Sequence, residues 1–569
     1  MNDQLPATSS PPLLYWLTCL LLFALPFELV GPLVRLPWFQ FTNLELLLGV
    51  VGLAWLVAAW RGGVGRPSRT LLLPAGAFLL VALLSALLAP AFRPTALKSA
   101  LRLASGLLPL LLVYAAAEDG DERRRRGLLW AILLGAGLSA LLGLAEWAGV
   151  PLVAPLLAQF KASPTFVGNV LRVSASFQYA TIAAMYWEMA IPLALLLATI
   201  AATRPGRVAA LAVALLLTLT TVLTLTRASF ITLALLLVGL LLAGWVWPRL
   251  RPLRRPAGVT LLWLSGLLLW SLVASDSFRQ RLATENDLNW YGAQYDAPAG
   301  LTLAAGEQLT LAVPVTNTGR AAWDSRAAYP IVLGYRWLSQ DGQQVYQLPP
   351  GSAALPRDVR PGETAIFSAT VMADLPPGQY RLAWGMRQAQ FAFYSRGVAE
   401  AETRVVVRPG RVTPPLPPTT PRSQYEQAAS APEIPTRREL WLAAGRMWWQ
   451  RPLLGGGPHT FRLRFGPYLG LANWDRRTHA NNLYLELLAD LGLLGLAAFA
   501  WLVVAAGRVL YLAAGRQPLW AAALAASLLA VGLHGVLDYF FEFWAVYWLF
   551  WALLGLALAL PRPGSGRER

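Results

Sequence analysis

Long runs of apolar residues recur along most of this chain. A helix needs about 20 apolar residues to cross the ~30 Å hydrocarbon core of a bilayer, because every backbone N–H and C=O must be satisfied within the segment. By that criterion the pattern predicts about twelve membrane helices, within residues 12–30, 41–60, 71–91, 97–117, 127–147, 179–202, 208–225, 228–247, 257–274, 482–506, 518–537 and 543–560. We therefore expect an all-α, polytopic membrane protein.

The apolar runs stop at residue 274 and resume near residue 482, and the pattern between them is different. Short stretches rich in β-branched and aromatic residues alternate with turn sequences such as Asn317-Thr-Gly319 and Pro376-Pro-Gly378. This spacing predicts an inserted all-β domain, an immunoglobulin-like sandwich in residues 297–408. It would lack the usual disulfide, because Cys19 is the only cysteine.

The other segments follow from these two patterns. Residues 1–274 should form an N-terminal membrane domain of about nine helices, and residues 482–569 about three more helices and a tail. A connector, 275–296, would precede the sandwich, and a stiff proline-rich linker, 409–436, would follow it. Residues 437–481 then contain an amphipathic helix and a polar loop. The apolar face of that helix comprises Leu440, Ala444, Met447 and Trp448, and we expect it to lie against the membrane surface.

The arginines fall mainly in alternate connections, as they do in cytoplasmic loops. Arg123 to Arg126 and the cluster between Arg249 and Arg255 are examples. This distribution predicts a multi-pass plasma (inner) membrane protein with both termini cytoplasmic and with the sandwich and the 437–481 loop extracytoplasmic. It also accounts for the net charge of +17 through anionic lipid headgroups, so no nucleic-acid partner is needed.

Three arginines depart from that bias because they fall at the predicted outer boundary. Arg227 lies in a very short turn between two helices, Arg172 lies just before the sixth helix, and Arg437 starts the amphipathic helix. A charge near the hydrocarbon needs a partner or a wet cavity, and a salt bridge or a snorkelling side chain would explain one such residue alone. Several together favour a diphosphate site, because guanidinium groups grip phosphate with paired donors.

Only three histidines occur, and each is a candidate. His479 stands directly before the tenth helix, where an imidazole with an ordinary pKa of about 6.5 could accept a proton, unless it is a structural residue bonded to a carboxylate such as Asp475. His459 follows a glycine-proline turn and either caps it or binds ligand. His534 and Asp538 are expected to pair structurally. No zinc-binding spacing and no nucleotide phosphate loop is present in the sequence, so we predict no metal and no cofactor.

Residues 451–495 resemble the C-terminal signature of the O-antigen ligase and polymerase family, integral membrane enzymes that act on lipid-linked glycans. The resemblance rests on the turn Pro452-Leu-Leu-Gly-Gly-Gly-Pro458 and on His479-Ala-Asn-Asn-Leu-Tyr-Leu-Glu486 before a helix. It implies that Arg227 and Arg437 hold an undecaprenyl diphosphate and that His479 activates the acceptor hydroxyl without a metal. The family often has a second histidine where this chain has Asn481. Either His479 is the base, or Asn481 only orients the acceptor.

We therefore predict a metal-independent, inverting glycosyltransferase. Arg227, Arg437 and His479 would be catalytic, and the substrate-binding residues would be Arg172, His459, Asn481 and Asn482. The donor would be an undecaprenyl-diphosphate-linked glycan, the acceptor a hydroxyl of a glycan, lipid or protein, and the remaining partners membrane lipids.

Two other functions remain open. A polymerase of lipid-linked repeat units shares the same signature, and a transporter or flippase of lipid-linked glycans also has about twelve helices, although the predicted helices have few midplane charges. The sandwich, which typical family members lack, is either a spacer or a glycan-binding module. Trp290, Tyr291 and Trp337 look exposed and would suit the second role.

Overall fold

The computed structural model describes residues 12–560 apart from 38, 66, 118–120, 168–169, 284–289, 328, 350, 389–390, 430–434 and 472. The predicted cytoplasmic tail, 561–569, and the first eleven residues lie outside the described residues. The chain forms two compact units. The first comprises Met1–Thr165, Val173–Trp270 and Pro435–Arg569, and the second comprises Phe166–Arg172 and Ser271–Ile434.

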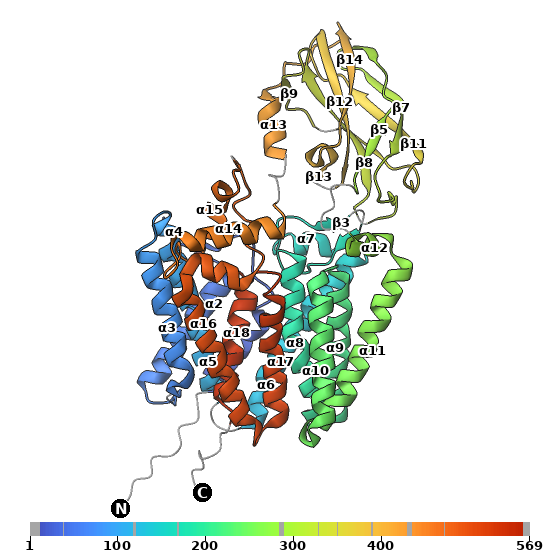
Figure 1. Ribbon diagram of the computed structural model, residues 1–569. Coiled ribbons are helices and arrows are strands. Elements are labelled where there is room, and N and C mark those ends of the chain that lie inside the picture. The colour runs from blue at the N-terminus through green and yellow to red at the C-terminus, as the bar shows by residue number, and fades with distance from the viewer. Residues whose placement is uncertain are drawn as a thin grey trace, which may run out of the picture. The chain divides into compact units, whose positions relative to one another are not determined.

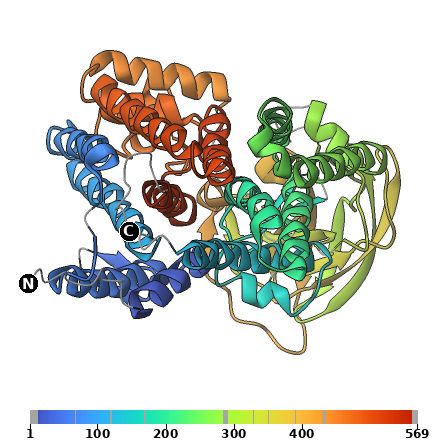
Figure 2. The same ribbon diagram turned by 90° about the horizontal axis from the view of Figure 1, so that it is seen from below.

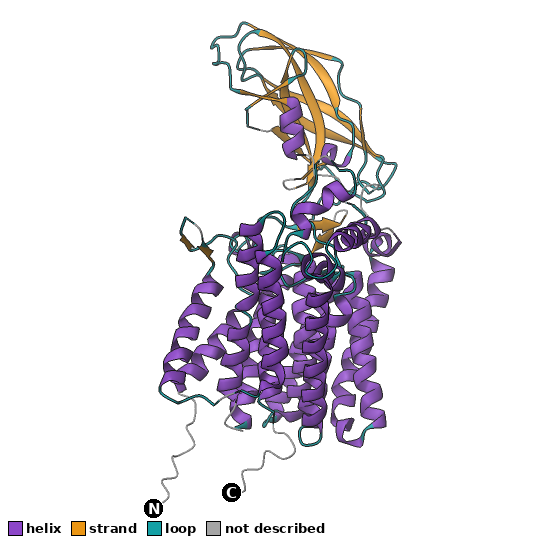
Figure 3. Ribbon diagram, turned by 60° about the vertical axis from the view of Figure 1, so that its left-hand side comes forward, coloured by secondary structure: helices purple, strands orange, loops and turns teal. Residues whose placement is uncertain are grey.

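The first unit is a bundle of apolar helices (Figures 1 and 3). Among the described residues, nine helical segments are long and apolar enough to cross a membrane: α2 (Asn43–Trp60), α3 (Arg69–Leu87), α4 with α5 (Arg93–Ala104 and Leu107–Ala117), α6 (Glu122–Trp147), α8 (Ala180–Ile200), α9 (Arg204–Leu223), α10 (Arg227–Val246), η1 with α11 (Pro248–Leu250 and Arg251–Ala274) and α16 (Leu483–Ala514). Three shorter apolar helices are α1 (Pro12–Ala24), α17 (Pro518–His534) and α18 (Trp544–Leu558). They fall on the predicted segments and confirm a polytopic membrane protein.

Two helices are nearly enclosed by the others (Figure 2). In α8, 94% of the membrane-length window is buried, and every residue of α18 is buried. Both are apolar on all faces, as a helix surrounded by helices must be. The exception is Glu188 in α8, which is fully buried and pairs with Nδ1 of His534 at 3.1 Å.

Two polar helices, α14 (Arg437–Gln450) and α15 (Phe461–Tyr468), lie across one end of this bundle (Figure 1). Thr436 and Glu439 form a capping box that fixes the start of α14. Its buried face, Leu440, Ala443, Ala444 and Met447, forms one core cluster with Phe461 and Phe465 of α15 and with Ala480 and Ala489. The apolar face of this helix therefore packs on α15 and α16, which offer an apolar partner, while Leu442 and Trp449 of the same helix are exposed. That the helix lies at the membrane surface stays a prediction.

Short elements complete the helical part of the chain and its connections. They are β1 (Val34–Arg35) paired with β2 (Gln40–Phe41), α7 (Val153–Leu157), β3 (Thr165–Val167) paired with β4 (Val170–Arg172), and α12 (Asp276–Ala283).

The second unit contains the predicted sandwich. One sheet has the order β15-β9-β8-β12-β14-β6, with β10 paired to β8 and β13 to β12, and the other has the order β11-β7-β5. The bounds are β5 (Ala293–Tyr295), β6 (Gly300–Ala304), β7 (Gln308–Asn317), β8 (Ile331–Ser339), β9 (Gln344–Tyr346), β10 (Gly351–Ala354), β11 (Thr364–Met372), β12 (Gly378–Gln388), β13 (Phe391–Ala392), η2 (Phe393–Arg396), β14 (Ala401–Arg408) and β15 (Thr419–Pro421). Strand β11 alternates exposed and buried residues along its length, as a strand covering a core does.

Two expectations about this unit need revision. Trp290, Tyr291 and Trp337 are 1%, 7% and 2% exposed, so they are buried and do not form the exposed aromatic surface that we expected. Composition cannot tell which side of a sheet an aromatic residue faces when the strand register is unknown. The segment 409–436 is also not wholly an extended linker, because it contributes β15 and the helix α13 (Arg422–Ala429).

Candidate active site

The helix α16 is broken at Gly492, where φ is +68°, and the glycine-rich turn 452–458 fills the break. Gly456 and Gly457 donate backbone hydrogen bonds to the carbonyls of Ala489 and Asp490, both at 2.9 Å, and Leu493 N donates to the Pro452 carbonyl at 2.8 Å. Turn and helix thus satisfy each other's backbone groups. Irregular backbone is tolerated in a membrane protein where it is buried in protein in this way.

Glycine is required at this junction for a steric reason. Gly455 also has a positive φ, +65°, and a Cβ on it would lie 2.4 Å from the carbonyl carbon of Asp490. No other residue lets two backbones approach so closely. The glycine turn in the sequence signature therefore serves to dock the loop into α16.

Asp490, three percent exposed, fixes the next part of the loop. Its carboxylate accepts hydrogen bonds from the backbone N–H groups of His459 and Phe461, the latter at 2.8 Å, at the start of α15. His459 has φ +64°, an uncommon conformation for a non-glycine residue that concentrates at functional sites. The orientation of His459 is therefore set by a carboxylate on α16.

The side chain of His479 lies between two carboxylates. Nδ1 contacts Oε1 of Glu486 in α16, and Nε2 contacts Oε2 of Glu542, in the connection between α17 and α18. Glu486 also accepts the backbone N–H of Ala480 at 2.8 Å. The carboxylate partner considered from the sequence, Asp475, instead binds Arg477 at 3.0 Å.

These contacts determine the charge of His479. Burial alone would lower its pKa, but the carboxylates of Glu486 and Glu542 outweigh burial and raise the pKa to about 10. Burial likewise acts to raise the pKa of Glu542, but the neighbouring His459 and His479 hold it far below the ordinary value. At neutral pH His479 is therefore an imidazolium beside a carboxylate. Both ring nitrogens are engaged by carboxylates, and a role of His479 as the general base stays a prediction.

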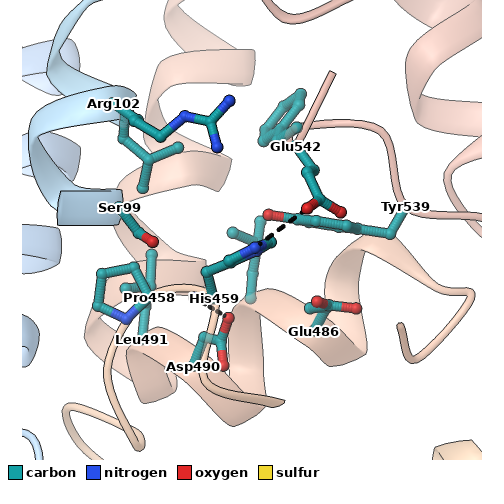
Figure 4. A pocket seen from close by; sticks show the side chains of 12 residues that line it. Ser99, Arg102, Pro458, His459, Glu486, Asp490, Leu491, Tyr539 and Glu542 are labelled. Atoms are coloured by element: carbon teal, nitrogen blue, oxygen red, sulfur yellow. Dashed lines mark hydrogen bonds and ion pairs between the residues drawn. The ribbon is translucent and has the colours of Figure 1, made fainter. Parts of the chain in front are cut away.

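His459 completes the cluster (Figure 4). Its Nε2 accepts a hydrogen bond from Nε of Arg462 at 2.7 Å and lies 3.2 Å from Oε1 of Glu542. Burial lowers the pKa of His459, which favours the neutral ring. Around these residues is a cavity of about 30 Å³, lined among others by Ser99, Arg102, Pro458, Glu486, Asp490 and Tyr539. That volume holds about one or two waters and is too small to enclose a sugar or a diphosphate.

The same cluster contains a possible set of metal ligands. Donor atoms of His459, His479 and Glu542 all lie within 4.8 Å of one another. Two histidines and one glutamate resemble the ligands of some zinc hydrolases. Here, however, Nε2 of His459 already accepts a hydrogen bond from the cationic guanidinium of Arg462, which a metal would have to displace. That no metal takes part stays a prediction.

The side chain of Arg437 lies close to the connection between α17 and α18, which contains Glu542. Its Nη2 lies 3.9 Å from Oδ2 of Asp538, and the side chain is 42% exposed. Asp538 in turn lies 3.6 Å from Nε2 of His534, so the predicted pairing of those two residues is confirmed. Arg437 and His479 thus meet the same short connection, residues 535–543.

Arg227 lies at the same end of the bundle. It begins α10, whose far end leads to Arg249, and Nη1 of Arg249 donates to the Gly515 carbonyl at 3.4 Å, just before α17. Helices α10 and α17 pack side by side. They therefore run antiparallel, which places Arg227 at the end where α17 reaches His534.

The remaining predicted substrate-binding residues have different surroundings. Asn482 caps α16, because its side chain accepts from Leu485 N at 2.9 Å and donates to the Val536 carbonyl at 2.8 Å. Asn481 is half-buried with φ +48°, a left-handed conformation that asparagine tolerates. Arg172 ends β4 and falls in the second unit. A role in substrate binding stays a prediction for all three.

Sequence reasoning missed the carboxylates of this site. Glu486 and Asp490 are buried in α16, as Glu188 is in α8, so the membrane helices contain more charge than the sequence reading allowed. Ionisable residues inside predicted membrane helices are functional candidates by default, and this signal would have identified all three. Glu542 carries no comparable signal, because it lies in a connection whose position only the fold reveals.

The fold and the cluster define a polytopic membrane protein with a charged histidine–carboxylate site at one end of its helix bundle. The model of the O-antigen ligase family matches residues 382–500. The match begins within β12 and includes α14, α15, His479 and the break in α16, and it confirms the resemblance to this family. It supports a membrane enzyme of the glycosyltransferase kind that acts on lipid-linked glycans. A search of curated proteins finds no match to the chain.

Proposed function

We propose that this protein transfers a glycan from undecaprenyl diphosphate to an acceptor hydroxyl at the extracytoplasmic face of the plasma membrane. The observation that carries the proposal is the meeting of Arg437 and His479 at the connection 535–543, at the bundle end that also holds Arg227. Cationic groups there are suited to a diphosphate, and the family match supports a lipid-linked glycan as donor.

In the proposed reaction the acceptor oxygen attacks the anomeric carbon of the glycan. The bond from that carbon to the phosphate oxygen breaks, and its electron pair leaves with the diphosphate, which stays on the carrier lipid. Arg227 and Arg437 neutralise the charge that develops on the leaving group, an electrostatic contribution that is commonly the largest in such sites. Direct displacement inverts the configuration at the anomeric carbon.

Glu542 is the better candidate to receive the hydroxyl proton. Its side chain is 26% exposed, against 8% for His479. The hydroxyl becomes strongly acidic only as it bonds to the anomeric carbon, so a weakly basic carboxylate within hydrogen-bond reach is sufficient. His479 then acts by holding Glu542 in position, and Glu486 holds His479.

This assignment predicts the pH dependence of transfer. The raised pKa of His479, about 10, means that the imidazolium–carboxylate pair is complete at neutral pH and is lost as pH rises through that value. Single-turnover rates should therefore stay level between about pH 6 and 9 and fall above about pH 10. A neutral His479 acting as base would instead give rates that rise roughly tenfold per pH unit through the neutral range, and that result would contradict the assignment.

Reconstitution tests the reaction itself. We expect purified protein in liposomes, given an undecaprenyl-diphosphate-linked glycan, to release carrier diphosphate only when an acceptor is added, and to yield an inverted linkage. Activity should persist in EDTA, because the arginines supply the positive charge that a metal would otherwise provide. Glu542→Gln, which keeps the size of the side chain but not its charge, should lose this activity.

The same assay separates the alternatives. Movement of the donor across the bilayer without a new glycosidic bond would indicate a transporter. A ladder of products from lipid-linked repeats alone would identify a polymerase. Complete loss of activity in EDTA, restored by added metal, would contradict the metal-independent reaction.

A further inference from the structure

The second unit contains a cavity of about 290 Å³, at the lower end of the range for ligand pockets. It lies beside β8 and β9 of the larger sheet, and its lining includes Thr420 of β15 and Tyr425 of α13. It lies within the inserted domain and has no part in the reaction proposed above.

One wall of the cavity is formed by β15 and α13, which belong to the segment that the sequence predicted to be a linker. Strand β15 pairs antiparallel with β9, and Gln347 Nε2 donates to Thr420 Oγ1 at 3.1 Å. Arg422 then anchors α13, because its backbone N–H donates to the Gln343 carbonyl at 2.7 Å and its Nη1 contacts Glu402 at 2.6 Å. These contacts hold the wall in place and also cover the edge of β9, which removes that edge as a site for adding a peptide strand.

The lining combines aromatic rings with charged and amide groups. The guanidinium of Arg336 lies 5.1 Å from the centre of the Tyr425 ring and pairs with Glu400 at 2.5 Å, which orients the tyrosine. Tyr425 is 39% exposed and Tyr346 is half-buried, so part of each ring is accessible. Arg387 is half-buried in the same lining, and among the described residues no carboxylate forms an ion pair with it.

We propose that this cavity binds a short segment of an acidic glycan. The apolar faces of sugar rings pack on tyrosine rings, and their hydroxyl groups bond to side chains such as Gln347 and Thr420. The guanidinium of Arg387 is placed to pair with a carboxylate or phosphate on the sugar. The inserted domain would then select the glycan by its charge, independently of the transfer step.

Binding of fluorescent oligosaccharides to the full-length protein in nanodiscs tests this inference without any transfer reaction. An array of acidic and neutral oligosaccharides is the probe. We expect selected acidic members to bind, with affinity about tenfold weaker in Arg387→Ala and in Tyr425→Ala. Arg404→Ala, at an exposed position of β14 in the same sheet and outside the cavity, should bind as the unmodified protein does.

Several outcomes would overturn the proposal. They are no binding to any member of the array, binding unaffected by both cavity substitutions, equal binding of neutral and acidic members, and equal binding of a polyglutamate peptide. Matching thermal unfolding of the three variants controls for misfolding. Arg387→Lys, which keeps the charge, should retain part of the affinity.

Discussion

Arg437→Ala should lower the rate of glycan transfer by about 10²–10³-fold, the loss typical of removing one donor that stabilises developing negative charge. The Arg437 side chain is 42% exposed and lies at the first residue of α14, where the helix dipole also favours an anion. Its contact with Asp538, at 3.9 Å, is longer than a hydrogen bond, so its donors can turn to a diphosphate.

The neighbouring residue provides a matched control. Arg438→Ala removes the same charge from the next position of the same exposed helix turn and should leave the single-turnover rate nearly unchanged. The single-turnover rate of Arg437→Lys should lie between the rates of the two alanine variants, because a lysine cannot make paired contacts to phosphate. Equal rates for Arg437→Ala and Arg438→Ala would remove Arg437 from the site. Arg227→Ala, measured in the same way, should behave like Arg437→Ala.

Gly492→Ala should destabilise the helix bundle by about 3 kcal/mol or more and abolish transfer with it. Gly492 has φ +68° and ψ −168°, a region essentially restricted to glycine, and another residue held there costs about 1–3 kcal/mol. The new Cβ would also lie 2.4 Å from the carbonyl group of Leu453, which forces the glycine turn out of the break in α16. Each buried backbone group that then loses its partner costs about 1–3 kcal/mol more.

Thermal unfolding in detergent, measured together with transfer rates, checks this expectation. Gly507→Ala is the control, because it lies in the same helix and its added Cβ would have no heavy atom within 4 Å. That substitution should be neutral or stabilising, since alanine is the better helix former by about 1 kcal/mol. If both variants unfold at the same temperature, the docking of the turn into α16 contributes nothing measurable.

The membrane helices were predictable because the bilayer allows few solutions. A segment that crosses the hydrocarbon core must be apolar and helical over a fixed length. The apolar pattern of the sequence is therefore enough to predict α8, α10 and the other membrane helices. The strands of the inserted domain were predictable to a lesser degree. Turn sequences separated them, but the side of the sheet that Trp337 of β8 faces depends on register.

The role of His479 shows what a local sequence cannot supply. The residues beside it in the chain suggested an imidazole with an ordinary pKa. Its two carboxylate partners come from α16 and from the connection after α17, and Glu542 lies far along the chain from His479. A pKa depends on charges within a few ångströms, so only the folded arrangement could reveal the carboxylates that raise the pKa of His479.

By itself the sequence determined the number and place of the apolar helices, the inserted β domain, and the glycine turn and histidine of the family signature. These are local properties, fixed by composition, periodicity and steric demand within one segment. Only the tertiary structure decided that Asp490 orients His459, that Glu486 and Glu542 enclose His479, and that α13 and β15 line a cavity beside the sheet. Each of these depends on distances between segments that the order of residues leaves open.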